Sequence, residues 1–194
     1  MTQNDYPYLA KQIKSCTLCE PHLPEGPNPV FQASSDAKIL IVGQAPGIRV
    51  HRSGIPFDDP SGDRLRDWMG IESGVFYDSR KIAIIPMGFC YPGTGKSGDL
   101  PPRPECAAAW RQPLLEHLPD IELTLVIGQY AIAWHLGNRK QKTLTQTVQN
   151  WKAYGPEIIP LPHPSPRNNI WMKKNPWFSE NVLPELRTSI SALL

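Results

Sequence analysis

The sequence predicts an α/β protein in which helices cover both faces of a four-stranded, mostly parallel sheet, a three-layer α/β/α sandwich. Four short aliphatic runs are continuous rather than alternating, which is typical of strands buried on both faces. These runs span residues 37–42, 81–86, 123–127 and 157–161. Apolar residues recur at helical spacing between them, and the resulting βαβαβαβ order favours a parallel sheet.

The expected helices lie between the runs and after the last one. One follows Ser61, a second begins at Pro104, and a third ends at Gly137. Apolar spacing also indicates helices over 143–151 and 182–193. Residues 1–36 carry few such signals, so we expect them to form a helix-poor extension of a single domain that spans 1–194.

Composition excludes several classes of protein. The chain has 194 residues, with 20 Lys and Arg against 18 Asp and Glu, so bulk charge predicts no partner and no charged tail. No apolar run is long enough to cross a membrane, and the opening residues lack the pattern of a signal peptide. We therefore expect a cytoplasmic protein without a membrane partner, and a monomer, because no oligomer signal is present.

The loops that follow the four predicted strands are expected to meet at one edge of the sheet. They contain the segments 43–47, 88–98, 128–131 and 162–166, which are rich in Gly, Pro and polar residues. Ligands of open parallel sheets bind outside the carboxyl ends of the strands. The sequence therefore predicts a ligand site at this edge.

Two of these loops have features of a binding site. Residues 43–47, GQAPG, fix a tight turn whose N–H groups can point at an oxygen-rich ligand, although an ordinary turn is about equally common for such a segment. His163 stands between two prolines that hold its loop rigid. The cations, amides and aromatics after it suit phosphates and stacked bases, while packing and solvation remain comparable explanations for each residue alone.

The four cysteines indicate a metal site. Cys16 and Cys19 form a CxxC pair upstream of the first strand, where a redox pair of a βαβ unit is not expected. Cys90 and Cys106 follow in later loops, and no cysteine is left over. Buried cysteines are often simple small hydrophobes. Four thiolates in an intracellular protein favour tetrahedral zinc or a 4Fe-4S cluster, and spacing alone does not separate the two.

Together these motifs resemble the uracil-DNA glycosylase superfamily, most closely its iron–sulfur branches, families four and five. The pattern G-x-A-P-G-x4-R-S/T-G-x-P-F matches residues 43–57 without a gap, and HPSP at 163–166 matches the third superfamily motif as family-one enzymes have it. The resemblance covers nearly the whole chain. It implies the α/β/α sandwich and a structural 4Fe-4S cluster, rather than zinc, held by Cys16, Cys19, Cys90 and Cys106.

The resemblance also implies a chemistry, which is hydrolysis of the N-glycosidic bond of a flipped uracil, or of another deaminated or damaged base, in DNA. Phe57 would stack on the base, and His163 would donate a hydrogen bond to the base oxygen that gains negative charge. The implied base pocket consists of Gly43, Ala45, Pro46, Gly47, Phe57 and Pro86. The implied DNA contacts are Ser165, Arg167, Asn168, Lys173 and Lys174.

Three positions depart from the family pattern. Ala45 stands where family-one enzymes have an Asp or Asn that holds the attacking water, and Gln44 stands where family four has Glu. Pro86 replaces an Asn that reads the uracil edge in family four, so that contact is missing. Nearby acids would then position the water. The expected catalytic residues are His163, Gln44, Asp58 and Asp59, with Asp63 as a further acid in the same segment.

Two alternatives to a glycosylase stay open at this point. The missing carboxylate at residues 44 and 45, together with Pro86, also suits a non-catalytic module that binds damaged or single-stranded DNA. A zinc- or cluster-bearing protein unconnected with DNA is the other. The salt dependence of DNA binding separates the DNA-binding interpretations from a protein unconnected with DNA, because binding to phosphates weakens steeply as salt is added.

Overall fold

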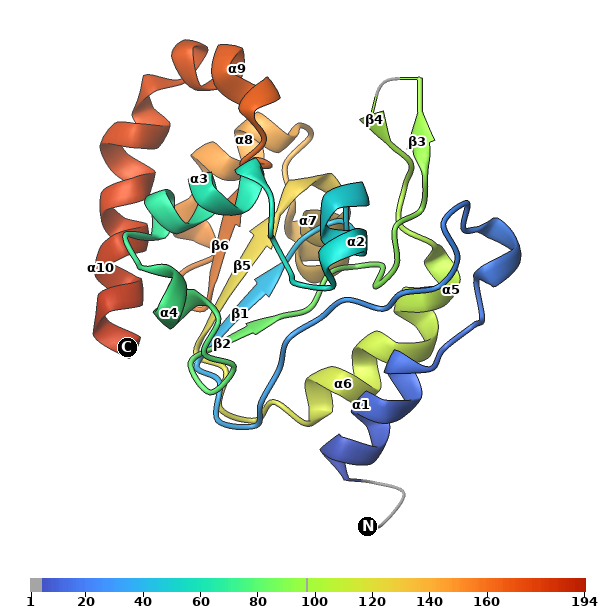
Figure 1. Ribbon diagram of the computed structural model, residues 1–194. Helices are drawn as coiled ribbons and strands as arrows, with labels where there is room; N and C mark the ends of the chain where they lie inside the picture. Colours follow the sequence, from blue (N-terminus) through green and yellow to red (C-terminus); the bar gives the residue numbers. More distant parts are fainter. Residues whose placement is uncertain (1–4, 97) are drawn as a thin grey trace.

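The central sheet has four parallel strands in the order β2-β1-β5-β6 in a computed structural model that describes residues 5–96 and 98–194 (Figure 1). The strands are β1 Ile39–Val42, β2 Ile82–Ile84, β5 Leu123–Ile127 and β6 Ile158–Leu161. On β1, Ile39 lies opposite Ile82 of β2 and Leu123 of β5. The predicted fold class is confirmed, and each strand falls inside its predicted run.

Alternate residues of each strand point to opposite faces of the sheet, so two hydrophobic cores form. Leu40 and Val42 of β1 belong to one core, whereas Ile39 and Ile41 belong to the other. All four side chains are nearly or wholly buried, which explains why the run is aliphatic without alternation.

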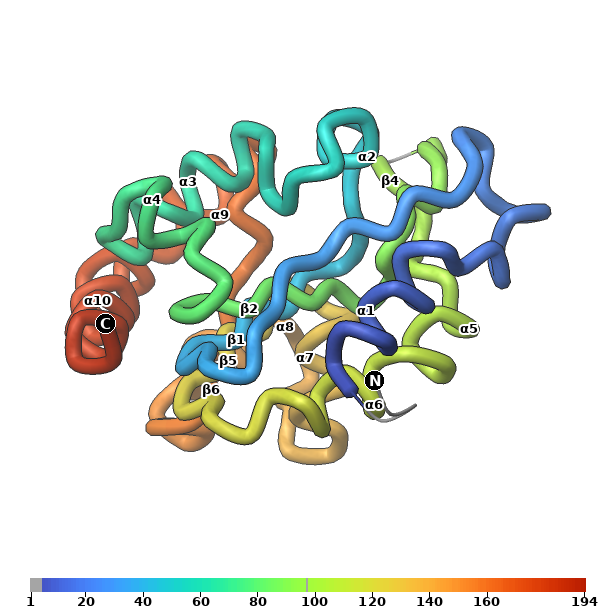
Figure 2. Tube along the Cα trace, turned by 60° about the horizontal axis from the view of Figure 1, so that its bottom comes forward, coloured from blue at the N-terminus to red at the C-terminus, as the bar shows by residue number. Residues whose placement is uncertain are grey.

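The helices divide between these two cores. The first face is covered by α1 Tyr6–Lys14, by the continuous helix α5 Pro104–Cys106, η2 Ala107–Arg111 and α6 Gln112–Glu116, and by α7 Gly128–Leu136. The second is covered by α3 Pro60–Met69, α4 Ser73–Phe76, α8 Leu144–Gln149, η6 Phe178–Val182 and α10 Leu183–Leu193. Figure 2 shows α1 and α6 side by side, well away from α10.

Shorter elements complete the chain. They are the helix α2 Ile48–Ser53, the turns η1 Glu20–His22, η3 Gly137–Arg139, η4 Trp151–Ala153 and η5 Pro166–Asn168, and the helix α9 Asn169–Lys174. None of the helices within 5–96 and 98–194 combines the length and the apolar character needed to cross a bilayer.

The N-terminal segment is more ordered than the sequence indicates. Residues 6–14 form α1, whose Leu9 and Ile13 are buried in the first core. Further along, Gln32 pairs with Ile84 in an antiparallel bridge at the edge of the sheet. The expectation of a helix-poor extension is therefore wrong for α1, because a helix of only nine residues gives a short apolar pattern and is stabilised by tertiary packing.

A hairpin that the sequence analysis does not predict stands at the carboxyl edge of the sheet. Its strands are β3 Thr94–Gly95 and β4 Gly98–Asp99, which pair antiparallel. In Figure 1 the hairpin projects past the carboxyl ends of the central strands, on the side of α2. Together with the loop after β6 it flanks this edge.

Candidate functional site

A cavity of about 480 Å³ opens at the carboxyl edge of the sheet. Its lining comes from the loops after β1, β2 and β6, from the connection between α2 and α3, and from β4 of the hairpin. This volume is typical of small-ligand pockets. The predicted loop after β5, at 128–131, forms the start of α7 and contributes none of the described lining residues.

The turn after β1 is fastened to its neighbours through its backbone. The N–H of Met87 donates to the carbonyl of Gly43 at 2.9 Å, and the N–H of Gly88 donates to the carbonyl of Gln44 at 3.0 Å. The side-chain amide of Gln44 donates to the carbonyl of Leu100 at 3.1 Å, just after the hairpin. Gln44 thus links the turn to the hairpin.

Phe57 forms one wall of the cavity. Its ring lies over Gly43, where an added Cβ would be 3.4 Å from the ring carbon Cζ. The same ring meets Phe76 edge to face, at 6.1 Å between centroids. Phe57 has a φ of +55°, which is rare for a residue other than glycine and marks a strained backbone. Gly62 permits this conformation, since an added Cβ there would lie 1.8 Å from the Phe57 carbonyl oxygen.

His163 faces the cavity from the loop after β6. Its Nδ1 accepts a hydrogen bond from the N–H of Ser165 at 3.2 Å. Burial lowers the pKa of His163, although the carboxylates of Asp59 and Asp99 oppose this shift. The ring is therefore neutral at physiological pH, and because Nδ1 accepts, the proton lies on Nε2. The imidazole can donate one hydrogen bond from Nε2.

Other hydrogen bonds hold the His163 loop in place. The side-chain amide of Asn168 donates to the His163 carbonyl at 2.6 Å. Arg64 of α3 donates to the carbonyl of Ser165 at 3.0 Å. Across the cavity Arg167 reaches the hairpin, where an added Cβ on Gly98 would lie 3.2 Å from its Nη1. The loop is thus tied to α3 and lies against β4.

Most of the residues that the sequence analysis names lie together. Those that line the cavity are Gly43, Gln44, Ala45, Pro46, Gly47, Phe57, Asp59, Pro86, His163, Ser165, Arg167 and Asn168. The structure places four others elsewhere. Asp58 faces a neighbouring groove, Asp63 pairs with Arg66 on α3 at 2.6 Å, and Lys173 and Lys174 are exposed at the end of α9.

Some lining residues were not expected from the sequence. Asp99 comes from the hairpin, and Ser61 comes from the first turn of α3. The remaining ones are the apolar residues Val30, Val50, Pro56 and Ile84. Gly98 also lines the cavity, and it ends the segment 88–98 that was expected at this edge. Asp99 lies one residue beyond that segment, and two-residue strands leave no periodic pattern that would show which way its side chain points.

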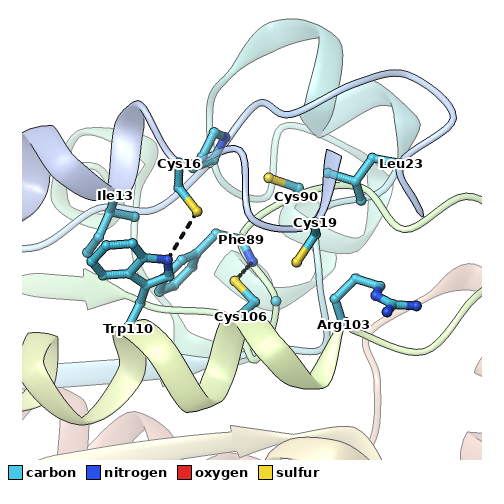
Figure 3. A pocket seen from close by; sticks show the side chains of 11 residues that line it. Ile13, Cys16, Cys19, Leu23, Phe89, Cys90, Arg103, Cys106 and Trp110 are labelled. Carbon is cyan, nitrogen blue, oxygen red and sulfur yellow. Dashed lines mark hydrogen bonds between the residues drawn. The ribbon is translucent and has the colours of Figure 1, made fainter. Parts of the chain in front are cut away.

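The four cysteines line a second, smaller cavity. Figure 3 shows Cys16, Cys19, Cys90 and Cys106 around a common space, beside Trp110 and Arg103. Apolar side chains, among them Ile13 and Leu23, close it. Cys16 comes from the segment after α1 and Cys106 from the end of α5, so this cavity joins the N-terminal segment to the chain beyond β2.

Several donors point at the sulfur atoms. The indole N–H of Trp110 donates to Sγ of Cys16 at 3.2 Å, and the N–H of Phe89 donates to Sγ of Cys106 at 3.3 Å. Burial raises the pKa of Cys90 to about 11 and that of Cys106 to about 12. Such groups become thiolates when a metal replaces their protons. Hydrogen bonds to sulfur are typical around iron–sulfur clusters, so the donor set fits such a group.

The geometry of the cysteines differs from that of a compact single-ion site. Among residues 5–96 and 98–194 no three or more His, Cys, Asp or Glu side chains are grouped closely enough to hold one metal ion. The four thiols nevertheless share one cavity.

The fold and the cavity define a protein of the open parallel α/β class with its ligand site at the carboxyl edge of the sheet. Residues 30–187 match the family described as the uracil DNA glycosylase superfamily, and the protein belongs to that superfamily. The chain is also 27% identical over 162 residues to the Type-4 uracil-DNA glycosylase of Thermotoga maritima, in an alignment that covers 81% of this chain and 80% of the relative. These matches confirm the resemblance that the motifs indicate.

Proposed function

We propose that the protein is a DNA glycosylase that hydrolyses the bond between uracil and deoxyribose during base-excision repair. The observation that carries this proposal is the cavity in which the ring of Phe57, the turn after β1 and the neutral imidazole of His163 meet. Membership of the superfamily and the similarity to a Type-4 uracil-DNA glycosylase support it. We further propose that the chain acts as one domain over 1–194, as a monomer and in the cytoplasm.

The cavity suits a base that has left the helix. A base inside a duplex is out of reach, so the enzyme extrudes it at a cost of a few kcal/mol. Phe57 would recover part of the lost stacking, since its ring is fixed against Gly43 and Phe76. The remaining pocket would be formed by Gly43, Ala45, Pro46, Gly47 and Pro86.

His163 would stabilise the leaving base. As the glycosidic bond breaks, its electron pair moves onto the base, and negative charge develops on the uracil oxygens. The Nε2–H of the neutral imidazole would donate a hydrogen bond to one of these oxygens. The N–H of Ser165 holds the ring in this tautomer, and the Asn168 amide holds the backbone carbonyl of His163, so the donor is in place before the reaction.

Contacts to DNA outside the cavity are proposed for the loop after His163 and for α9. Ser165 and Arg167 lie at the cavity rim, where a hydroxyl and a guanidinium suit phosphate oxygens. Lys173 and Lys174 are exposed on the next helix and would add favourable charge along the backbone. Asn168 would act mainly by holding the His163 carbonyl.

We also propose that Cys16, Cys19, Cys90 and Cys106 hold a 4Fe-4S cluster, with zinc as the alternative that metal analysis would reveal. The cluster would supply a cross-link between the N-terminal segment and the loop after β2. The shared cavity of the four thiols and the N–H donors to Cys16 and Cys106 support this.

An excision assay tests the proposed function. Oligonucleotides that carry a single uracil, hypoxanthine, xanthine or oxidised base are incubated with the protein, and abasic sites are then cleaved with alkali. We expect cleavage at uracil, and a rate about 10²–10³-fold lower for His163→Ala, because one donor to the developing anion is lost. Binding of lesion DNA without cleavage at any of these bases would instead identify a non-catalytic DNA-binding module.

A further inference from the structure

A carboxylate outside the two motifs at 43–57 and 163–166 faces the cavity from the hairpin. Asp99 of β4 lines the cavity together with Phe57 and His163. Its Oδ2 lies 3.4 Å from the position that a Cβ on Gly47 would occupy. The carboxylate therefore lies beside Gly47 in the turn after β1, and Gly47 is two residues after Ala45 in the sequence.

The Asp99 carboxylate makes few other side-chain contacts. Within the described residues, the side-chain hydrogen bond that Asp99 accepts comes from the hydroxyl of Thr94, at a long 3.5 Å. Within residues 5–96 and 98–194 no Lys, Arg or His nitrogen pairs with it within 4.0 Å. A carboxylate at a cavity rim with free acceptor positions is available to bind a water molecule.

The other acids near the cavity are less available. Asp59 caps the N-terminus of α3, and its Oδ1 accepts the N–H of Gly62 at 2.9 Å. Asp58 lines the neighbouring groove with Lys14 and Tyr77 instead.

Hydrogen bonds connect the hairpin to the turn after β1. The Gln44 amide holds the carbonyl of Leu100, and the N–H of Leu100 donates to the carbonyl of Gly93 at 2.8 Å. On the other strand, the hydroxyls of Tyr91 and Thr94 are 2.5 Å apart. Hydrogen bonds therefore hold Leu100, next to Asp99, and Thr94, opposite Asp99. The position of Asp99 relative to the turn is thus defined by the fold.

We propose that Asp99 is the residue that holds and deprotonates the attacking water. This inference rests on the proposed glycosylase function. The water oxygen forms a bond to C1′ of deoxyribose as the bond from C1′ to the base nitrogen breaks. The electron pair of the broken bond leaves with the base, and the water proton passes to the Asp99 carboxylate and then to solvent. Asp99 thereby takes the place of the acid missing at Ala45.

The charges around this position suit the reaction. Asp99 and Asp59 are negative and His163 is neutral, while Arg167 is the cation at the rim. Positive charge develops on the sugar as the base departs, and two nearby carboxylates favour it electrostatically. Closure of DNA over the cavity would remove water and strengthen these interactions.

The test is single-turnover release of uracil by Asp99→Asn, a substitution that keeps the shape of the side chain and removes the base. We expect a rate 10²–10⁴-fold below wild type. Affinity for DNA with an uncleavable uracil analogue should stay within a few-fold of wild type. Asp99→Glu should recover part of the rate.

Matched variants separate the possible causes. Asp120→Asn removes a carboxylate that pairs with Lys38 far from the cavity, and it should leave the rate unchanged. Asp59→Asn retains a good helix cap and should lower the rate less than Asp99→Asn does. A rate for Asp99→Asn within about three-fold of wild type overturns the assignment while the proposed function stands. Failure of the wild-type protein to release uracil overturns both.

Discussion

The tautomer of His163 determines what this side chain can do. Nδ1 accepts from the N–H of Ser165, and burial lowers the pKa of the ring, so His163 is a neutral donor rather than a cation. A neutral donor stabilises an anion that forms during the reaction without binding phosphate strongly beforehand. The residue therefore discriminates between the transition state and the ground state.

Gly62 is the residue on which the position of Phe57 depends. We expect Gly62→Ala to lower the free energy of unfolding by about 1–3 kcal/mol and to reduce uracil release, because a Cβ would collide with the Phe57 carbonyl. The control is Gly74→Ala on α4, where a Cβ would meet no atom within 4 Å. Urea unfolding and the excision rate check both, and equal stabilities of the two variants would refute the expectation.

Arg111 is a buried cation that connects the cysteine-bearing helix to the cavity wall. Its Nη1 donates to the carbonyls of Ile85 and Pro86, each at 2.9 Å, and it stacks on Trp134 at 4.7 Å. Arg111→Met should lower the free energy of unfolding by roughly 2–4 kcal/mol, because two buried carbonyls lose their donor. Arg80→Met, which removes an exposed guanidinium beside Asp78, should leave the free energy of unfolding nearly unchanged. A similar loss of unfolding free energy in both variants would show that the buried hydrogen bonds of Arg111 contribute little to stability.

The contact between Arg111 and His135 predicts acid sensitivity. Burial, with Arg111 nearby, lowers the pKa of His135 to about 3, and their side chains are 2.9 Å apart. The unfolded chain binds a proton at the ordinary pKa near 6.5 while the folded chain does not, so stability is full above that pH and is lost as pH falls toward 3. His135→Gln should flatten this part of the stability curve, measured by urea unfolding between pH 7 and 4. An unchanged slope would argue against the shift.

At the scale of elements, the four strands and the site edge could be predicted, while the hairpin and α1 could not. Strands buried on both faces, such as Ile39–Val42, give continuous aliphatic runs that no exposed element shares. The hairpin has two-residue strands with glycine in each, so it looks like a loop. Adjacent acids are equally ambiguous, because only the fold shows that Asp59 lines the cavity while Asp58 lines the next groove.

At the scale of the whole molecule, the cysteine cavity joins the N-terminal segment to the rest of the fold. We expect the purified protein to be brown and to contain iron and sulfide in the ratio of a 4Fe-4S cluster. Cys106→Ser should bleach the colour and expose the N-terminal segment to early proteolysis, because the cross-link to residue 16 is lost. Stoichiometric zinc in a colourless preparation would show that the four thiols hold a different group.

The proposed function requires an extruded uracil to occupy the cavity between Phe57 and His163. Fluorescence of 2-aminopurine placed beside an uncleavable uracil analogue in duplex DNA reports extrusion directly. Wild type should raise the fluorescence. Ala45→Tyr, which fills the cavity from the turn after β1, should still bind DNA and melt like wild type but leave the fluorescence low. An equal rise with both proteins would show that the base goes elsewhere.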